Sequence, residues 1–181
     1  MNDYENGIIY FYFFEAKSYQ SVTVQLFNFP DPSAFRIRKS ENETEIFDVI
    51  RKKFVRFTPE EWVRQHLLKF LVEKNFPASL IAVEKELIVA GIKKRTDVVV
   101  YSNQAEPLLI AECKSPDVPI DQNAFDQAAR YNLSLTVPCF LLTNGLTHFC
   151  CRMNSAEKKY EFLEEIPAYS ELVLAKSTIK V

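Results

Sequence analysis

Three charged side chains, Asp97, Glu112 and Lys114, lie in or directly beside short apolar segments that have the character of buried strands. These segments are residues 95–101 and 108–114, and the polar stretch between them predicts a β-hairpin. Because side chains alternate along a strand, Glu112 and Lys114 share one face of theirs. The hairpin would therefore bring two carboxylates and one ammonium group together at one of its ends.

Two carboxylates in this position would be suited to holding a divalent cation. Buried charge is costly unless it is paired or bound to a metal, and oxygen ligands suit Mg²⁺ or Mn²⁺. Such an ion supports phosphodiester hydrolysis by neutralising developing charge and acidifying a water molecule. We expect Asp97 and Glu112 to be catalytic metal ligands and Lys114 to orient or deprotonate the attacking water. The structural alternative is that Asp97 and Glu112 form salt bridges with Arg95 or Lys114, and that Lys114 is a surface lysine at a strand end.

The order of these residues resembles the PD-(D/E)xK nuclease signature, with Thr96 at the position of the proline. Further segments occur in the order seen in the N-terminal nuclease domain of type I restriction enzyme R subunits: residues 58–65, 94–97, 112–116, 127–132 and 143–145. The resemblance covers roughly residues 51–153 and is to short stand-alone bacterial members of that family. It implies a restriction-endonuclease-like mixed β-sheet flanked by helices, Mg²⁺-dependent cleavage of DNA, and restriction-modification or repair proteins as partners.

The resemblance also implies a third acid on the first helix, and we expect Glu61 to be this further metal ligand. A local explanation competes with it, because a glutamate three residues after Thr58 forms a capping box. Glu60 is an alternative, since it lies on the side of the helix that carries the apolar residues. Glu84, on the strand that follows, is another candidate acid.

Gln127 and Tyr131 are four residues apart and so share one face of a helix. This Gln-x-x-x-Tyr pattern resembles the motif that follows the lysine in RecB-like and R-subunit nuclease domains, which implies contacts with the nucleic-acid backbone. Ordinary helix surface is the alternative. Arg64, on the first helix, is a further candidate for nucleic-acid binding. The sequence contains no Gly-x-x-x-x-Gly-Lys-Ser/Thr loop, so we expect no ATP-driven translocation by this chain.

The surrounding sequence predicts the elements that would position the hairpin. Thr58 is a helix N-cap, and the helix should extend to about Lys74. Residues 83–89 predict a strand and residues 121–135 a second helix. Residues 139–143 form a continuous apolar run, which is typical of a strand buried on both faces. A helix that connects the hairpin to this strand should place the two side by side in a mixed sheet, within an α/β sandwich.

The chain divides into three predicted regions. Residues 1–50 form a β-rich N-terminal extension packed on the domain, residues 51–155 form the nuclease-like core, and residues 156–181 form a C-terminal tail. Within the extension, strands are expected at residues 8–14, 22–29, 35–38 and 45–49. The tail predicts either a weak strand or a helix.

Composition excludes several classes of protein. The chain has 181 residues, with 48% hydrophobic and 25% charged residues, as in an ordinary globular protein. Its apolar runs are shorter than a membrane span, and no signal peptide is evident. The cysteines have no metal-ligand spacing and are expected to be free thiols of a cytoplasmic protein. The net charge of −2 argues against bulk coating of nucleic acid. Local clusters at residues 51–53 and 93–95 either contact phosphates or form solvated surface.

These observations favour a metal-dependent DNA nuclease. The alternative is a catalytically silent nucleic-acid-binding or assembly domain with the same fold. A metal-dependent phosphatase is a remote third interpretation, because the sequence has no two-metal cluster of His and Asp. The sequence leaves open the DNA specificity and the oligomeric state; a homodimer would permit cleavage of both strands.

Overall fold

The computed structural model describes residues 2–5, 8–15, 18–25, 27–29, 35–39, 43–89, 92–133, 137–154 and 159–179. For some of these residues only the backbone is described, and they include Gln127 and Tyr131. In chain order the elements are β1 (Asn2–Glu5), β2 (Ile8–Glu15), β3 (Ser18–Gln25), β4 (Ile37–Lys39), β5 (Thr44–Asp48), β6 (Lys53–Arg56), α1 (Pro59–Glu73), the 3-10 turn η1 (Ala78–Leu80), β7 (Ile81–Val89), β8 (Ile92–Tyr101), β9 (Pro107–Cys113), α2 (Gln122–Leu133), β10 (Cys139–Thr143), β11 (His148–Asn154), β12 (Lys159–Leu163) and α3 (Tyr169–Ile179).

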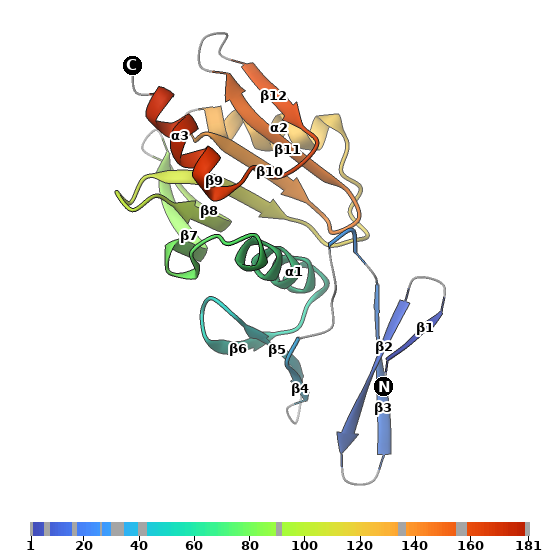
Figure 1. Cartoon of the computed structure of the whole chain (residues 1–181). Coiled ribbons are helices and arrows are strands. Elements are labelled where there is room, and N and C mark those ends of the chain that lie inside the picture. Colours follow the sequence, from blue (N-terminus) through green and yellow to red (C-terminus); the bar gives the residue numbers. More distant parts are fainter. Residues whose placement is uncertain are drawn as a thin grey trace.

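A six-stranded mixed sheet forms the centre of the molecule, with strand order β12-β11-β10-β9-β8-β7. The predicted hairpin is present as the antiparallel pair β8–β9, and β10 lies parallel to β9 after the crossover through α2. Helices cover both faces of this sheet, α2 on one and α1 with α3 on the other (Figure 1). The predicted fold class, a mixed β-sheet flanked by helices, is therefore confirmed.

The alternation of side chains along β8 and β9 divides the core in two. Val98, Val100 and Ala111 belong to the core that includes α1 and α3. Val99 and Ile110, which lie between them in sequence, belong to the core beneath α2. These strands are apolar on both faces because a helix covers each face, which is why they read as continuous apolar runs in the sequence.

Helix α1 lies between two sheets, the six-stranded sheet on one side and the small β4-β5-β6 sheet on the other (Figure 1). Its N-terminus is as predicted, since the side chain of Thr58 accepts a hydrogen bond from the backbone N–H of Glu61. The sequence predicts a single apolar stripe, whereas the structure buries every residue from 61 to 68. Packing on two sides explains this difference, because few positions of such a helix can face water.

Residues 27–29, which precede β4, contact the six-stranded sheet at the turn between β10 and β11. The backbone N–H of Asn28 donates to the carbonyl of Gly145, in the turn between β10 and β11. Phe27 packs against Gly145 so closely that a Cβ at residue 145 would lie 2.7 Å from the phenyl ring. Gly145 also has a φ of +86°, a conformation that L side chains rarely adopt. Glycine is thus required there for two independent reasons.

The predicted extension contributes strands to two sheets, the second of which is completed by β6 beyond residue 50. β1–β3 form a sheet of their own, which Figure 1 draws away from the helices, whereas β4–β6 pack on the core through Ile46. The C-terminal region contains both of the elements that the sequence left as alternatives, β12 and α3. The division of the chain at residues 50 and 155 stays a prediction. Among the helices that the structure describes, none combines the length and apolar character that a bilayer crossing requires.

Candidate functional site

Asp97 and Glu112 stand on neighbouring strands, each one residue beyond the paired Val98 and Ala111. Residues that face each other across an antiparallel pair share a face of the sheet. Asp97 Oδ2 accepts a hydrogen bond of 2.7 Å from the backbone N–H of Cys113, the residue after Glu112. The Asp97 carboxylate is therefore held against the backbone that carries Glu112, as the hairpin prediction requires.

Lys114 follows β9 directly, and its side chain is exposed. Its backbone N–H donates to the carbonyl of Thr143 at 2.8 Å, which fixes the chain at the point where β9 and β10 both end. The thiol of Cys113, between Glu112 and Lys114, is fully buried. Burial raises its pKa well above the ordinary value, and the charge of Asp97 raises it further. This thiol is accordingly neutral and does not compete as a nucleophile.

A buried arginine joins the helix to the hairpin. Arg64 is 4% exposed. Its Nη2 lies 2.9 Å from Asp97 Oδ1 and 3.0 Å from Glu60 Oε1, and its Nη1 donates to Glu61 Oε2. The guanidinium faces carboxylates, and the predicted contact of Arg64 with nucleic acid stays a prediction.

A second arginine, Arg51, extends these contacts. It lies in the turn after β5 and donates to Asp48 Oδ2 at 2.6 Å, to Glu61 Oε1 at 2.8 Å and to Glu84 Oε2. Glu84 also accepts from Arg95 Nη2 at 2.6 Å. We call these linked side chains the carboxylate–arginine network; its members are Asp48, Arg51, Glu60, Glu61, Arg64, Glu84, Arg95 and Asp97.

The network keeps both central guanidinium groups charged. Burial by itself would lower the pKa of Arg64, but the charges of Asp97 and Glu61 more than offset burial and raise it above the ordinary value. Burial opposes the charge of Arg51 in the same way, and its hydrogen bond and proximity to Asp48 lead the interactions that raise its pKa. A buried charge pair is tolerated only when its hydrogen bonds are satisfied, which explains the number of contacts.

Glu84 lies at a local irregularity in β7. The pairing of β7 with β8 skips Glu84, which has a φ of +52°, although the register is the same on both sides of it. A non-glycine residue in this left-handed region costs about 1 kcal/mol or more. The irregularity coincides with the contact between Glu84 and Arg51. Glu84, the further candidate acid named from the sequence, thus lies beside the candidate site.

Glu61 is the acid of α1 that makes the most contacts in the network. The local explanation, a capping box, requires its side chain to return to the backbone of Thr58; instead both oxygens accept from Arg51, Arg64 and Gln65. The side chain of Glu61 is 8% exposed and that of Glu60 is 45% exposed. Of the two alternatives, Glu61 is the one enclosed in the network.

The network has oxygen donors and an excess of negative charge. Five carboxylates are linked to three guanidinium groups, before Glu112 is counted. Gln65 adds a buried Oε1 that has no hydrogen-bond partner within the described part of the chain. Hard oxygen donors and uncompensated charge suit Mg²⁺ or Mn²⁺. Yet no three side chains of His, Cys, Asp or Glu converge as metal ligands among the residues that the structure describes. The donor chemistry fits a divalent cation, although its ligands are engaged with arginines.

The sequence does not single out Asp48 of the network, and two predicted site residues outside the network have no described side chain. Asp48 was missed; its signal is a carboxylate at an inward position of β5, two residues after the buried Ile46. Gln127 and Tyr131 lie in α2, but their side chains are outside the described residues, so their predicted contacts stay predictions.

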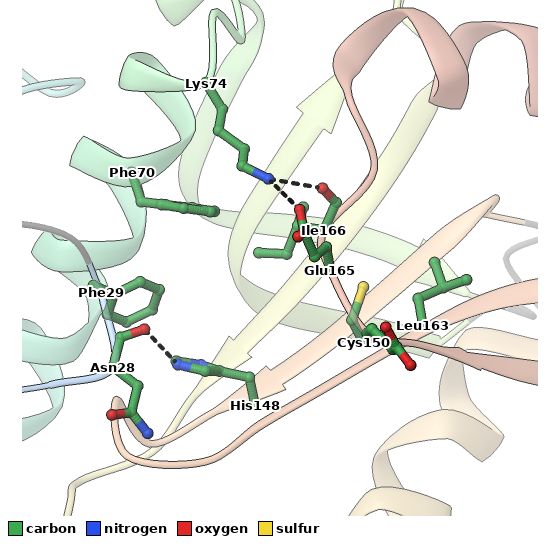
Figure 2. Close-up of a pocket in the computed structure, with 10 residues that line it drawn as sticks. Asn28, Phe29, Phe70, Lys74, His148, Cys150, Leu163, Glu165 and Ile166 are labelled. Carbon is green, nitrogen blue, oxygen red and sulfur yellow. Dashed lines mark hydrogen bonds and ion pairs between the residues drawn. The ribbon is translucent and has the colours of Figure 1, made fainter.

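A cavity of about 300 Å³ lies at the other end of α1, lined by Phe29, Phe70, Lys74, His148 and Cys150 among others (Figure 2). Lys74 lies near Glu165 and the carbonyl of Ile166, while the imidazole of His148 lies near the carbonyl of Asn28. Glu61 is in the first turn of α1 and Phe70 in its last, so this cavity is remote from the network. It does not belong to the candidate site.

The fold and this site define an α/β protein with a charged cluster at one end of a mixed sheet. Residues 59–167, more than half of the chain, match the model of the family described as type I restriction enzyme R protein N terminus. The chain belongs to this family, which confirms the resemblance found in the sequence.

Other comparisons add less. No curated protein matches the chain. A fragment structure of a proposed HsdR subunit of a type I restriction enzyme from Vibrio vulnificus YJ016 is similar, with a TM-score of 0.43 and 19% sequence identity. The match covers 61% of this chain and 23% of that chain. The family assignment therefore rests on the family model alone.

Proposed function

We propose that this protein is a metal-dependent nuclease that hydrolyses phosphodiester bonds of DNA. Membership of the R protein N-terminus family supports this. The observation that carries the proposal is the position of Asp97 and Glu112 on adjacent strands at the end of the β8–β9 hairpin, together with the link from Asp97 through Arg64 to the buried Glu61. This arrangement supports Asp97 as the central acid of the proposed site.

In this proposal Asp97, Glu112 and Glu61 would hold Mg²⁺ or Mn²⁺, which supplies charge neutralisation and an acidified water when bound. Asp97 is oriented for this by the backbone N–H of Cys113. Lys114, exposed at the end of β9, would orient the attacking water and stabilise negative charge on the phosphate. Its fixed backbone and free side chain suit that role.

Cleavage of linear, circular, single-stranded and branched DNA with Mg²⁺ or Mn²⁺ tests the proposal. Wild type is compared with Lys114→Ala and Asp97→Asn, and Lys159→Ala serves as a control because it removes a lysine from β12, at the opposite edge of the sheet from β7. We expect cleavage by wild type and the control, and loss of activity in both site variants. Activity that survives Lys114→Ala would remove Lys114 from the mechanism.

The second candidate is a catalytically silent nucleic-acid-binding or assembly domain. The hydrogen bond between Arg64 and Asp97 favours it, because a carboxylate already paired with a guanidinium does not require a metal. Calorimetric titration separates the two candidates. Absence of Mn²⁺ binding, together with no cleavage of any substrate, would support the silent domain.

A further inference from the structure

The outer face of the β4-β5-β6 sheet carries arginines that the candidate site does not use. Ile37, Ile46 and Val55 pack toward the core, so the residues between them face outward. Arg36 extends this face beyond β4, because its carbonyl accepts from the backbone N–H of Phe47 at 2.8 Å. We call this surface the arginine face; it consists of Arg36, Arg38, Glu45, Phe47, Phe54 and Arg56.

Aromatic rings hold two of these arginines against the sheet. Arg36 Cζ lies 4.5 Å from the ring centroid of Phe47, and Arg38 Cζ lies 4.0 Å from that of Phe54. The two rings contact each other edge to face at 5.3 Å. A guanidinium stacked on a ring is positioned without using its N–H donors. The stacking thus leaves donors on the surface available to a ligand.

Exposure and pairing differ among the three arginines. Arg56 is exposed, with 76% of its side chain accessible, and lies 3.6 Å from Glu43. Arg38 is also exposed but forms a 2.6 Å salt bridge with Glu45. Arg36 is exposed and forms no ion pair within the described part of the chain. Glu45 therefore engages Arg38 and Glu43 engages Arg56, whereas Arg36 has no such partner among the described residues.

The charge of this region is opposite to that of the chain as a whole. Residues 35–57 contain seven Lys or Arg and four Asp or Glu, a net charge of +3, whereas the whole chain carries −2. The region is also continuous with the candidate site, since β5 ends at Asp48 and the next turn contains Arg51, both members of the network. A polyanion would be attracted to this sheet and repelled by the acids beyond it.

We propose that the arginine face binds the sugar–phosphate backbone of a nucleic acid whose cleavage site lies at the carboxylate–arginine network, an inference that rests on the proposed function. Arg36 and Arg56 contact phosphates, and this contact positions the strand without reading its sequence. Phe47 and Phe54 lie beneath Arg36 and Arg38 and hold these guanidinium groups in place. The sheet thus provides a binding surface for the strand next to the acidic site.

The test is binding of a fluorescein-labelled oligonucleotide, single-stranded or duplex, followed by fluorescence anisotropy in EDTA over a series of KCl concentrations. The test variant is Arg36→Ser with Arg56→Ser. The matched control is Arg152→Ser with Lys159→Ser, which removes the same charge from β11 and β12. We expect the test variant to lose about tenfold or more in affinity, with a salt slope shallower by about 1.4 for single strands or about 1.8 for duplex. The control should keep the wild-type slope.

A variant that should bind more tightly separates a lost contact from unfolding, because an unfolded protein would not gain affinity. Glu45→Gln removes the carboxylate that engages Arg38 and should tighten binding at every salt concentration. Wild-type affinity and slope in the Arg36/Arg56 variant, or equal losses in the control, would overturn the proposal. Because EDTA prevents metal-dependent cleavage, the binding result is separate from activity. Binding through the face without cleavage in Mg²⁺ would reject the nuclease function and leave the surface in place.

Discussion

Arg64 Nη2 lies 2.9 Å from Asp97 Oδ1, so a helix residue and a strand residue 33 positions apart share a partly buried hydrogen bond. The same guanidinium reaches Glu60 and Glu61. One side chain therefore links the first helix to the hairpin that carries Asp97. The predictions below concern this contact and the residues around it.

Arg64→Gln should lower the free energy of unfolding by about 3–5 kcal/mol, because it leaves the carboxylates of Glu61 and Asp97 without their shared counter-charge. Denaturation by urea, monitored by circular dichroism, measures the change. Arg95→Gln is the control, since the Arg95 side chain is 66% exposed; its loss should cost less than about 1 kcal/mol. Equal costs for both substitutions would show that burial of the network contributes nothing.

Mn²⁺ should stabilise the Arg64→Gln variant more than it stabilises wild type. Removal of the guanidinium increases the uncompensated negative charge near Asp97, which favours a divalent cation. Ligand binding to the folded state adds about 2.7 kcal/mol when the ion is present at a hundred times its Kd. Thermal unfolding with and without Mn²⁺ measures this, and chelation should reverse it. Identical shifts in both proteins would mean that the cation binds away from Arg64.

Glu61→Gln and Glu60→Gln form a matched pair that decides which acid of α1 acts in the site. If the protein cleaves DNA, the change at Glu61 should reduce kcat/KM by about tenfold or more, which corresponds to about 1.4 kcal/mol. Glu61 contacts both central arginines, whereas Glu60 contacts Arg64 alone. The Glu60 variant should therefore stay within about threefold of wild type. The reverse order would identify Glu60 as the acid of the site.

The protein should lose stability as the pH falls through the range in which His66 titrates. Burial among the rings of Phe27, Phe35 and Trp62 lowers the pKa of His66 to about 4. In the unfolded chain its pKa is about 6.5. The unfolded state binds the proton first, so the contribution is complete above about pH 6.5 and is lost as the pH falls toward about 4.

The lost stability amounts to about 3 kcal/mol at most. Unfolding by urea at a series of pH values measures it, with His66→Gln as the reference that lacks this group. The Nδ1–H of His66 donates to the carbonyl of Trp62 at 2.9 Å, a bond that the neutral ring can make. If the free energy of unfolding of wild type depended on pH as weakly as that of the variant, the low pKa of His66 would be contradicted.

Much of the fold follows from local sequence patterns. The hairpin of β8 and β9, the apolar strand β10 and the capped helix α1 were predicted because alternation, apolar runs and an N-cap residue are local signals. Asp97 and Glu112 could be paired from the hairpin alone. Such signals report which residues are buried, and they place neighbours along one strand or helix.

The contacts of the arginines could not be predicted in this way. Arg64 and Asp97 meet because α1 packs against the hairpin, and Arg51 reaches Glu84 from the turn after β5, which belongs to another sheet. Burial of α1 on two sides likewise depends on where β4–β6 pack. The hydrophobic periodicity of the helix sequence does not encode that position. Long-range packing decides whether a carboxylate faces water, a metal or a guanidinium.

The fit of Phe27 against Gly145 has a consequence for dissecting the chain. A fragment that began near residue 51 would lose Phe27 and Ile46 from the core and would uncover one side of α1. The acids of α1 would then lie on a helix that faces water on one side, where the dielectric constant is much higher. The smallest piece that preserves the electrostatics of the site must therefore begin upstream of residue 27.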